Sequence, residues 1–302
     1  MTIAAAILAD SISPAGVRLT TFQLRYPRMI HSEFMTHRLF SRNASSSRAI
    51  PVAKMIADLR QDPAMPVFWG SNKPGMQAGE ELTGVDLDLA QSAWLMGMED
   101  AIAWVEKMVA AGLHKQIANR MLEPWAHINV VCTATDWANF YELRRHKDAQ
   151  PEMRALAEAM YVEHEKSIPR LLQPGEWHLP YIDDHDHDEV GDLLVPEAHD
   201  RLIKVSVARC ARVSYLTFEG KTSTFEEDLQ LYERLLGAQP LHASPAEHQA
   251  TPDTQSSVEL IYAGHGNVLE NPSQDFDNPH QHGNLRGWRQ YRKMLPGEFI
   301  PG

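Results

Sequence analysis

Residues 86–112, DLDLAQSAWLMGMEDAIAWVEKMVAAG, form the segment that most restricts the possible folds of this chain. Apolar side chains recur along it at three- and four-residue spacing, which is the period of an amphipathic α-helix. The segment ends at Gly112, a residue type that often closes a helix because it adopts a left-handed backbone without steric cost. We therefore predict one long helix with an apolar stripe made of Leu87, Ala90, Trp94, Met98, Ile102, Val105 and Val109.

Other segments have the pattern of β-strands. Residues 16–28 alternate apolar and polar side chains from Val17 to Leu24, as expected of a strand with one buried face. Residues 128–135, INVVCTAT, are rich in β-branched side chains. The apolar run within residues 1–14 lacks the basic region of a signal peptide, and we interpret it as a strand or an ordered arm.

Shorter helices are predicted between and after these strands. The apolar residues of 29–39 have nearly helical spacing, and Pro51 suits the first turn of a helix over 51–61. A Ser-x-x-Glu capping box at Ser223 begins a helix over 223–237. A further helix is predicted over 114–122, ending before Pro124, and another starts at Thr135 or Asp136. Two more are predicted, one over about 151–172 and one within 202–216, where a helix leads to a strand.

The overall charge excludes several classes of function. The 302-residue chain has a formal net charge of −12, which disfavours broad binding of nucleic acid or of anionic membranes. No stretch approaches the roughly 20 apolar residues of a membrane span. Because its two cysteines, Cys132 and Cys210, lack metal or redox spacing, we expect a reduced, cytoplasmic location.

Against this acidic background, residues 33–51, EFMTHRLFSRNASSSRAIP, gather cations and hydroxyl groups. Arginines can donate to phosphate or carboxylate oxygens in a fixed fork. The segment lacks the glycine spacing of a P-loop or of a Rossmann turn. It is therefore either a solvated, serine-rich surface turn or a phosphate site built from Arg38, Arg42, Arg48, Ser45, Ser46 and Ser47.

Three further groups could carry chemistry. Arg120 and the pair in NFYELRR, Arg144 and Arg145, are either helix-surface arginines or anion ligands. The segment HASPAEH, residues 242–248, is a polar turn or a weak metal site. Residues 178–192 alternate His and Asp, but metal sites usually gather ligands from separate elements, so we predict a solvated acidic loop there.

Taken together, these motifs resemble those of the flavin-dependent thymidylate synthases. The segment THRLFSRNASSSR is similar to the family's Arg-His-Arg loop and its Ser-x-Asn-x-x-Ser-x-Arg frame. ANRMLEP, NFYELR, ARVSY and HASPAEH are similar to four other family motifs. The matching residues are His37, Arg38, Ser41, Asn43, Ser46, Arg48, Arg120, Asn139, Arg144 and Ser214.

The order of these motifs differs from that of the family. There, the Ala-Arg-Val-Ser and His-x-Thr-Pro segments come before the Arg-His-Arg loop, whereas here they follow NFYELR. We interpret this as a circular permutation, which is feasible because domain termini often lie close together at the surface. The permutation predicts that the residues after His248 lie near the strand that begins at about Val17.

The resemblance implies an α+β fold with a twisted, largely antiparallel sheet flanked by helices. It also implies methylation of dUMP with FAD, NADPH and methylenetetrahydrofolate. The nucleotide and the folate would be the small-molecule partners of a homotetramer whose sites lie between subunits. We expect residues 1–302 to form a single catalytic domain, with 61–112 as a helical insertion and 251–302 as a C-terminal extension.

Roles are carried over to this chain by matching residues. Since hydride delivery from reduced flavin requires no protein nucleophile, neither cysteine is needed as one, and no metal is expected. Arg38, Ser46 and Arg144 would be catalytic. The nucleotide would contact Glu33, Ser45, Ser46, Ser47, Arg48, Arg120 and Arg144. The flavin would contact His37, Arg38, Leu39, Asn43, Asn139, Ser214, His242, Ser244 and Glu247.

Three positions depart from the family pattern. Thr36 replaces the first Arg of Arg-His-Arg, Ala44 stands where Glu is usual, and Glu33 where Gln is common. An arginine suits a carbonyl such as uracil O4, whereas Glu33 could accept from the amino group of cytosine. The alternatives are therefore methylation or hydroxymethylation of dCMP or dUMP, and a flavin- or nucleotide-binding homologue without turnover. For uracil, the missing arginine would be replaced by Arg286 or Arg289.

Overall fold

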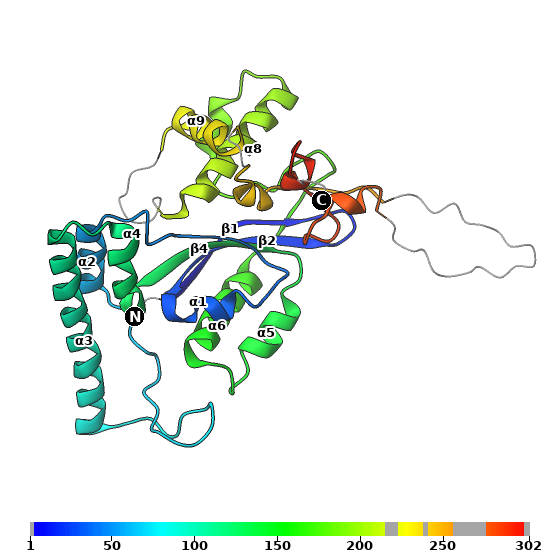
Figure 1. Ribbon diagram of the computed structural model, residues 1–302. Coiled ribbons are helices and arrows are strands. Elements are labelled where there is room, and N and C mark those ends of the chain that lie inside the picture. The colour runs from blue at the N-terminus through cyan, green and yellow to red at the C-terminus, as the bar shows by residue number, and fades with distance from the viewer. Residues whose placement is uncertain (1–2, 215–222, 238–240, 256–275, 299–302) are drawn as a thin grey trace, which may run out of the picture.

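A five-stranded twisted sheet forms the centre of the protein (Figure 1). The computed structural model describes residues 3–214, 223–237, 241–255 and 276–298. The strand order is β3-β4-β2-β1-β5, and every neighbouring pair is antiparallel except β1 with β5. This confirms the predicted α+β fold class. The strands are β1 (Ala4–Ile12), β2 (Arg18–Pro27), β3 (Ser41–Ala44), β4 (His127–Ala134) and β5 (Arg170–Leu171), with a separate pair, β6 (Ala250–Pro252) and β7 (Trp288–Gln290).

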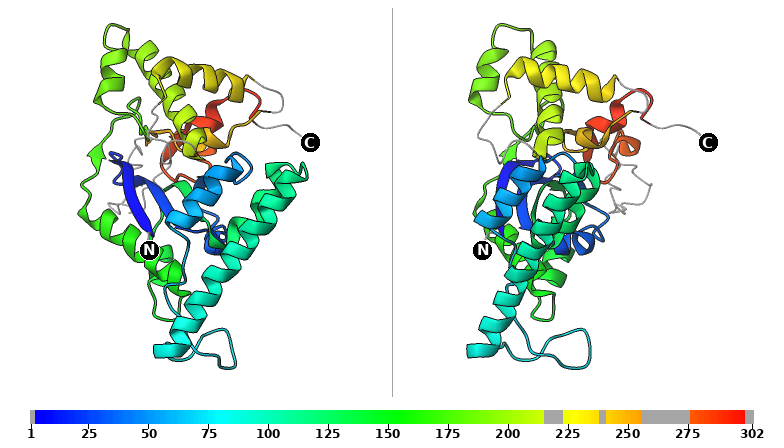
Figure 2. Two further views of the ribbon diagram at one scale, coloured as in Figure 1. Left: turned by 90° about the vertical axis from the view of Figure 1, so that its left-hand side faces the viewer. Right: turned by 60° about the vertical axis from the view of Figure 1, so that its left-hand side comes forward.

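Helices lie on both sides of this sheet (Figures 1 and 2). α5 and α6 lie on one side, α8 and α9 on the other, and α3 extends beyond the body beside α2 and α4. Within the described ranges, no helix is long and apolar enough to cross a bilayer. The helices are α1 (His31–Phe34), α2 (Val52–Gln61), α3 (Gly84–Ala110), α4 (Lys115–Ala118), α5 (Ala138–Arg144), α6 (Pro151–Lys166), α7 (Asp184–Glu189), α8 (Val195–Ala211) and α9 (Phe225–Leu236). The 3-10 segments among the described residues are η1 (Arg28–Ile30), η2 (Asn119–Trp125), η3 (Arg212–Ser214), η4 (Ser244–Glu247), η5 (Pro279–Gln281) and η6 (Tyr291–Met294).

The largest core cluster lies between the sheet and helices α5 and α6. Phe22, Leu24 and Tyr26 of β2 are fully buried in it with Met153 and Met160 of α6. These side chains share one face of β2 because successive residues of a strand point to opposite faces. Burial of apolar area at about 25 cal/mol per Å² is the main favourable term here.

The opposite face of β2 is polar. Thr21, Gln23 and Arg25 occupy it, and the hydroxyl of Thr21 lies 2.7 Å from that of Thr133 on β4. Buried polar groups require such partners, because an unpaired one loses its hydration without compensation. The candidate site borders this polar face.

Most predicted elements are confirmed. Strands β1, β2 and β4 lie where the sequence placed them, as do α2 and the long helix α3. Gly112 closes α3 with a φ of +91°, a conformation that favours glycine. The inner part of the apolar stripe packs as expected, through Met98, Ile102 and Val105. Its outer residue Val109 is exposed.

Several boundaries differ from the prediction. The helical pattern of 29–39 yields only the 3-10 turn η1 and the four-residue α1. Helix α1 ends at Phe34 with Met35 as its C-cap, and the following residues form the turn that leads to β3. The predicted helix 114–122 becomes the short α4 followed by η2, which continues through Pro124. The predicted connector 174–199 contains α7 and the start of α8.

The predicted caps are also shifted. The capping box of α9 is formed by Thr224 with Glu227, one residue after the predicted Ser223, whose hydroxyl instead donates to Asp228. Helix α5 has Trp137 at its N-cap without a side-chain hydrogen bond, rather than a cap from Thr135 or Asp136. Within 202–216, where a helix was predicted to lead to a strand, α8 ends at Ala211 and Arg212–Ser214 form the 3-10 turn η3, while residues 215 and 216 lie outside the described residues.

The residues after His248 lie beside the start of β2, as the permutation predicts. Ala250 of β6 and Trp288 of β7 share one buried cluster with Val17 and Leu19. The indole Nε1 of Trp288 donates to the carbonyl oxygen of Val17 at 3.1 Å. The C-terminal segment therefore packs against the same sheet as the N-terminal strands.

We expect Trp288→Ala to lower the free energy of unfolding by about 3–5 kcal/mol, because the indole is fully buried and leaves a cavity. Trp104→Ala is the matched control. Its side chain is 57% exposed on α3, so the expected loss is below about 1 kcal/mol. Urea unfolding of both variants measures the difference. Equal losses would show that the C-terminal segment is not part of the core.

Candidate functional site

The cationic segment runs from α1 through β3 into the loop that follows it. Between α1 and β3 the side chains of Arg38 and Leu39 are exposed, as is Thr36, whose hydroxyl donates to the carbonyl oxygen of Glu33 at 2.7 Å. Arg42 turns inward and donates to the carbonyl oxygen of Phe34 at 3.0 Å. Of these cations, Arg38 thus faces solvent and Arg42 holds the turn.

His37 and Arg144 meet across this turn. The Nε of Arg144 lies 2.9 Å from Nε2 of His37, and the His37 ring packs edge-on against Phe140. Burial, together with the nearby cations Arg144 and Arg42, lowers the pKa of His37 to about 4. His37 is therefore neutral at pH 7, and its Nε2 accepts the Arg144 hydrogen bond.

A single carboxylate organises the loop after β3. Oε1 of Glu123, in η2, accepts from the hydroxyl of Ser47 at 2.6 Å and from Nη1 of Arg120 at 3.0 Å. The same oxygen lies 3.2 Å from Nε of Arg28. The Glu123 cluster, meaning Glu123 with Arg28, Ser47 and Arg120, therefore fixes Arg120 next to the 45–48 loop.

Two more side chains hold this loop from the α4–η2 segment. The buried amide of Asn119 donates to the carbonyl oxygens of Ser47 at 2.8 Å and Ile50 at 3.0 Å. Nζ of Lys115 donates to the carbonyl oxygen of Ala49 at 3.0 Å. Sequence reasoning missed Asn119 and Glu123, although they flank Arg120 in ANRMLEP and lie within one helical turn of it.

The three loop serines differ in what they contact. The hydroxyl of Ser45 accepts from the backbone N–H of Asn129 at 3.1 Å, and that of Ser47 bonds to Glu123. Both side chains are buried. Ser46 is partly exposed, and Arg48 is exposed with its Nε 3.5 Å from the Ser46 hydroxyl. The surface that a ligand reaches is thus made by Ser46 and Arg48, while Ser45 and Ser47 anchor the loop.

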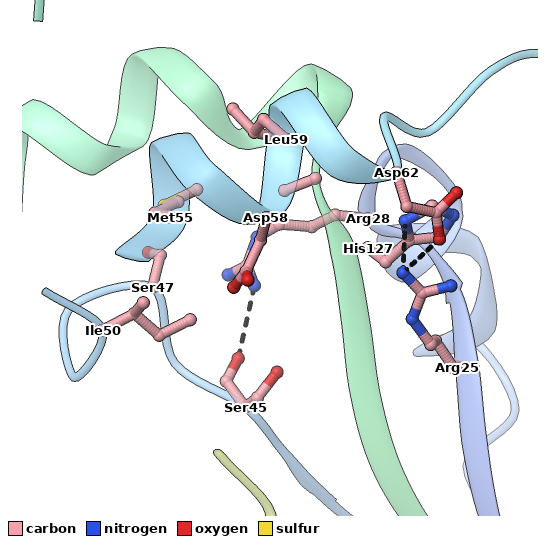
Figure 3. A pocket seen from close by; sticks show the side chains of 11 residues that line it. Arg25, Arg28, Ser45, Ser47, Ile50, Met55, Asp58, Leu59, Asp62 and His127 are labelled. Atoms are coloured by element: carbon pink, nitrogen blue, oxygen red, sulfur yellow. Dashed lines mark hydrogen bonds and ion pairs between the residues drawn. The ribbon is translucent and has the colours of Figure 1, made fainter. Parts of the chain in front are cut away.

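A small cavity lies behind this loop, between α2 and the polar face of the sheet (Figure 3). Arg28 enters it and donates to the carbonyl oxygen of Ser45 at 3.3 Å. On its other side Arg25 pairs with Asp62 at 2.7 Å and lies 3.0 Å from Nδ1 of His127. The cavity has a volume of about 40 Å³, which accommodates water but not a nucleotide.

The residues predicted to contact a flavin lie at two places. η4, with Ser244 and Glu247, packs against β3, where the amide of Asn43 can donate to the carbonyl oxygen of Ser244 at 3.2 Å. Glu247 pairs with Arg292, and His242 is exposed nearby. Ser214 ends η3, which also contacts β3 and β4, although its side chain lies outside the described residues. Asn139 is separate and exposed on α5, the helix whose Phe140 packs against His37.

The predicted residues therefore form three groups arranged along β3. His37 and Arg38 precede this strand, and Arg144 of α5 joins them through its contact with His37. The 45–48 loop, with Arg120 beside it, follows the strand, and η4 packs against it. The C-terminal segment joins them, because Asn284 donates to the carbonyl oxygen of Leu39 at 2.8 Å. Arg286 and Arg289, expected to replace the missing arginine, contact Asp136 and Gln281 in this structure.

The acidic stretch 178–192 has structural partners. Asp183 and Asp186 form the capping box of α7, and Asp186 is bound bidentately by Arg209 at 2.6 and 2.7 Å. In the described part of the chain, no group of three His, Cys, Asp or Glu side chains is arranged to hold a metal. Both cysteines are buried, which raises the pKa of each thiol.

The Glu123 cluster generates a stability prediction. We expect Glu123→Gln to lower the free energy of unfolding by about 1–3 kcal/mol, because the largely buried donors of Ser47 and Arg28, and the exposed Arg120, lose an anionic acceptor. Glu99→Gln is the matched control, since Glu99 pairs with Arg60 at the exposed surface, where ion pairs contribute at most about 1 kcal/mol. Thermal unfolding of both variants measures the two losses, and a smaller loss for Glu123→Gln would contradict the role assigned to it.

The His37 contact generates a prediction about pH. The pKa of histidine is about 6.5 in the unfolded chain, and that of folded His37 is about 4. Between these two pH values the unfolded state binds more protons than the folded state, so the contribution of His37 to the free energy of unfolding decreases as the pH falls. Arg144→Gln removes the neighbouring charge and should raise the pKa of His37, measured by NMR titration. Arg145→Gln, which breaks the pair with Glu158 and the stacking on the Tyr161 ring but removes no contact to His37, should leave it unchanged. An unaltered pKa in Arg144→Gln would assign the shift to burial alone.

Comparisons with known proteins add two findings. The structure is similar to that of a UMP/dUMP methylase PolB from Streptomyces cacaoi bound with 5-Br dUMP, with a TM-score of 0.45, 18% identity, and coverage of 55% of this chain and 91% of that chain. The same protein bound with 5-Br UMP gives a TM-score of 0.45, 18% identity, 55% coverage of this chain and 89% of the other. Among curated proteins no match was found.

The second finding concerns the family. The model of the family described as "Thymidylate synthase complementing protein" matches residues 10–170, more than half of the chain. That range contains the cationic segment, Arg120 with Glu123, and Arg144. The chain therefore belongs to the flavin-dependent thymidylate synthase family.

Proposed function

We propose that this protein is an enzyme that methylates dUMP, with FAD, NADPH and methylenetetrahydrofolate as cofactors. The family match over residues 10–170 carries this proposal, because it includes the residues that form the cationic surface. The protein would act in the cytoplasm on small-molecule nucleotide and folate, as a homotetramer without nucleic acid or membrane partners. Residues 1–302 would be one catalytic domain, with 61–112 inserted and 251–302 appended.

The nucleotide phosphate would bind at the loop after β3. Arg48 and Arg120 are exposed there, and both can donate charge-assisted hydrogen bonds to phosphate oxygens. Ser46 adds a hydroxyl beside Arg48. Ser45 and Ser47 would act indirectly by anchoring this loop. Arg120 would exchange its contact with Glu123 for one with the phosphate.

The flavin would bind on both sides of the start of β3. Arg38 offers an exposed guanidinium to its pyrophosphate, and Leu39, His37 and Asn139 would add further contacts. Asn43, Ser214, His242, Ser244 and Glu247 would contact it from the η4 side. The donors in this set suit a phosphate-bearing cofactor, and reduced flavin would supply the hydride. Arg38, Ser46 and Arg144 would stabilise charge that develops on the pyrimidine oxygens.

A second candidate substrate is dCMP, with a methyl or hydroxymethyl product. It is favoured by Glu33, whose carboxylate has no hydrogen bond or ion pair with any described residue. A carboxylate accepts hydrogen bonds only, and cytosine offers an amino group where uracil has a carbonyl oxygen. The Thr36 hydroxyl is already directed to the Glu33 carbonyl oxygen, so it provides no arginine-like donor for uracil O4.

The direct test is a reaction with the purified full chain. Protein, FAD, NADPH and methylenetetrahydrofolate are incubated with dUMP or with dCMP, and the nucleotide product is identified by mass. A 14-Da increase on dUMP supports the proposal, and an increase on dCMP supports the second candidate. Flavin absorbance and nucleotide binding without product would identify a homologue that binds both ligands without turnover. Failure to bind either ligand would overturn all three interpretations.

We expect Arg48→Ala and Arg120→Ala each to weaken dUMP binding by roughly 1.5–3 kcal/mol while the protein stays folded, because each removes a charged contact to phosphate. Isothermal titration measures the affinities. Arg60→Ala is the control, since Arg60 lies on α2 and pairs with Glu99 at the surface. Unchanged affinity in both test variants would identify the loop as a solvated surface turn.

Glu33→Gln distinguishes the two bases. If cytosine is the base, this change should weaken dCMP by roughly 1–3 kcal/mol, the contribution of one good base contact, and leave dUMP nearly unaffected. If uracil is the base, the added amide donor should not weaken dUMP. An equal loss for both nucleotides would show that Glu33 does not read the base.

A further inference from the structure

A continuous chain of hydrogen bonds crosses the buried interior from β1 to the residue after η4. The hydroxyl of Ser11 lies 2.8 Å from Nδ1 of His178, and Nε2 of His178 lies 2.8 Å from the hydroxyl of Thr21. That hydroxyl is 2.7 Å from the hydroxyl of Thr133, which in turn lies 2.8 Å from Nδ1 of His248. Five groups from five separate parts of the sequence thus form one line, which we name the Ser11–His248 chain.

All five side chains of the Ser11–His248 chain are buried, and none carries a charge. Burial lowers the pKa of His178 and of His248 to about 3, so both imidazoles are neutral at pH 7. At the His248 end the chain of hydrogen bonds stops, because Nε2 of His248 is buried without a hydrogen-bond partner among the described residues. Ser11, at the other end, keeps 5% of its surface exposed, whereas His248 keeps none.

Counting protons shows that this chain has two arrangements. Each of the five groups carries one proton, but only four hydrogen bonds join them, so one proton is always left at an end. In the first arrangement every group donates toward His248, and the free proton is on His248 Nε2. In the second every group donates toward Ser11, the free proton is on the Ser11 hydroxyl, and His248 Nε2 is a bare acceptor.

We infer that the Ser11–His248 chain is a proton relay that switches His248 Nε2 between donor and acceptor. A proton that arrives at Nε2 of His248 moves each proton one bond along the chain, and the outer proton of Ser11 leaves to solvent. Each bond broken is matched by one formed, both imidazoles stay neutral, and the tautomers of His178 and His248 reverse together. Without a ligand the second arrangement dominates, because Ser11 is the most exposed of the five residues, at 5%, whereas His248 has no exposed surface on which a free N–H could be solvated.

The ligand served by this relay is one that exchanges a proton with a buried imidazole, such as a heterocycle with a ring nitrogen. His248 directly follows η4, whose Ser244 and Glu247 are proposed to contact the flavin. This part of the inference rests on the proposed function. The switching itself does not, because it follows from the hydrogen-bond geometry alone.

The test is side-chain ¹⁵N NMR of the full chain labelled at histidine, at pH 7 and without ligand. In the unaltered protein we expect His248 to be protonated on Nδ1, with Nε2 in the unprotonated range. Ser11→Ala removes the acceptor of the His178 Nδ1 proton, so both arrangements then leave one unsatisfied N–H. The His248 Nε2 resonance should therefore move toward the protonated range, although Ser11 does not contact His248.

Two variants separate relay from distortion. Ser13→Ala also removes a buried serine near the end of β1, one that bonds only locally to the backbone of Val17, and it should not move the His248 resonance. Thr133→Val interrupts the chain, so Ser11→Ala in that background should have no effect on His248. An unmoved resonance in Ser11→Ala, an equal shift in Ser13→Ala, or a shift that persists with Thr133→Val would each overturn the relay.

Adding FAD to the labelled protein tests the ligand. A change of the His248 Nε2 resonance on binding supports the connection between the relay and the flavin, and bound FAD without such a change overturns it. If FAD does not bind, the proposed function fails, while the response to Ser11→Ala still decides whether the relay exists.

Discussion

The pairing of β4 with both β2 and β3 is the constraint on which the rest of the structure depends. Alternate residues of β4, such as Ile128 and Val130, pack in the core with α5 and α6, while Asn129 and Thr133 face the polar side of the sheet. A shift of the register by one residue would exchange these faces. Through Asn129 the strand fixes the loop after β3, and through Thr133 it fixes the Ser11–His248 chain. The position of the cationic surface is therefore a consequence of the register of β4 with its neighbouring strands.

Much of this fold could be predicted because its signals are local. The β-branched run that becomes β4 and the periodic stripe of α3 each lie within one segment. The site could be predicted only in part. Its arginines are visible in the motifs, but Glu123 has its role because η2 packs against a loop about 75 residues earlier in the chain. The capping box at Thr224 was displaced by one residue because Ser223 donates to Asp228 instead, a choice set by tertiary contacts.

Local electrostatics, rather than the net charge of −12, determines the behaviour of the site. The carboxylate of Glu123 accepts from three donors at once, so Arg28 and Arg120 are held in place without a bound anion. Such an arrangement lowers the cost of ordering side chains on binding. His37 acts differently, since its neutral ring accepts a hydrogen bond from Arg144 without adding charge. The two contacts explain how an acidic protein presents a well-ordered cationic surface.

The contact of the C-terminal segment with the turn before β3 has a consequence for synthesis of the protein. Asn284 bonds to Leu39 and Ser41, and Trp288 bonds to Val17, a separation of 271 residues. A ribosome produces roughly 5–20 residues each second, so these contacts cannot form until nearly the whole chain has emerged. Val17 and Leu19 of the N-terminal strands therefore lack part of their packing until then, and contacts of such long range also slow folding. A nascent chain stalled before residue 284 would expose the turn that holds His37.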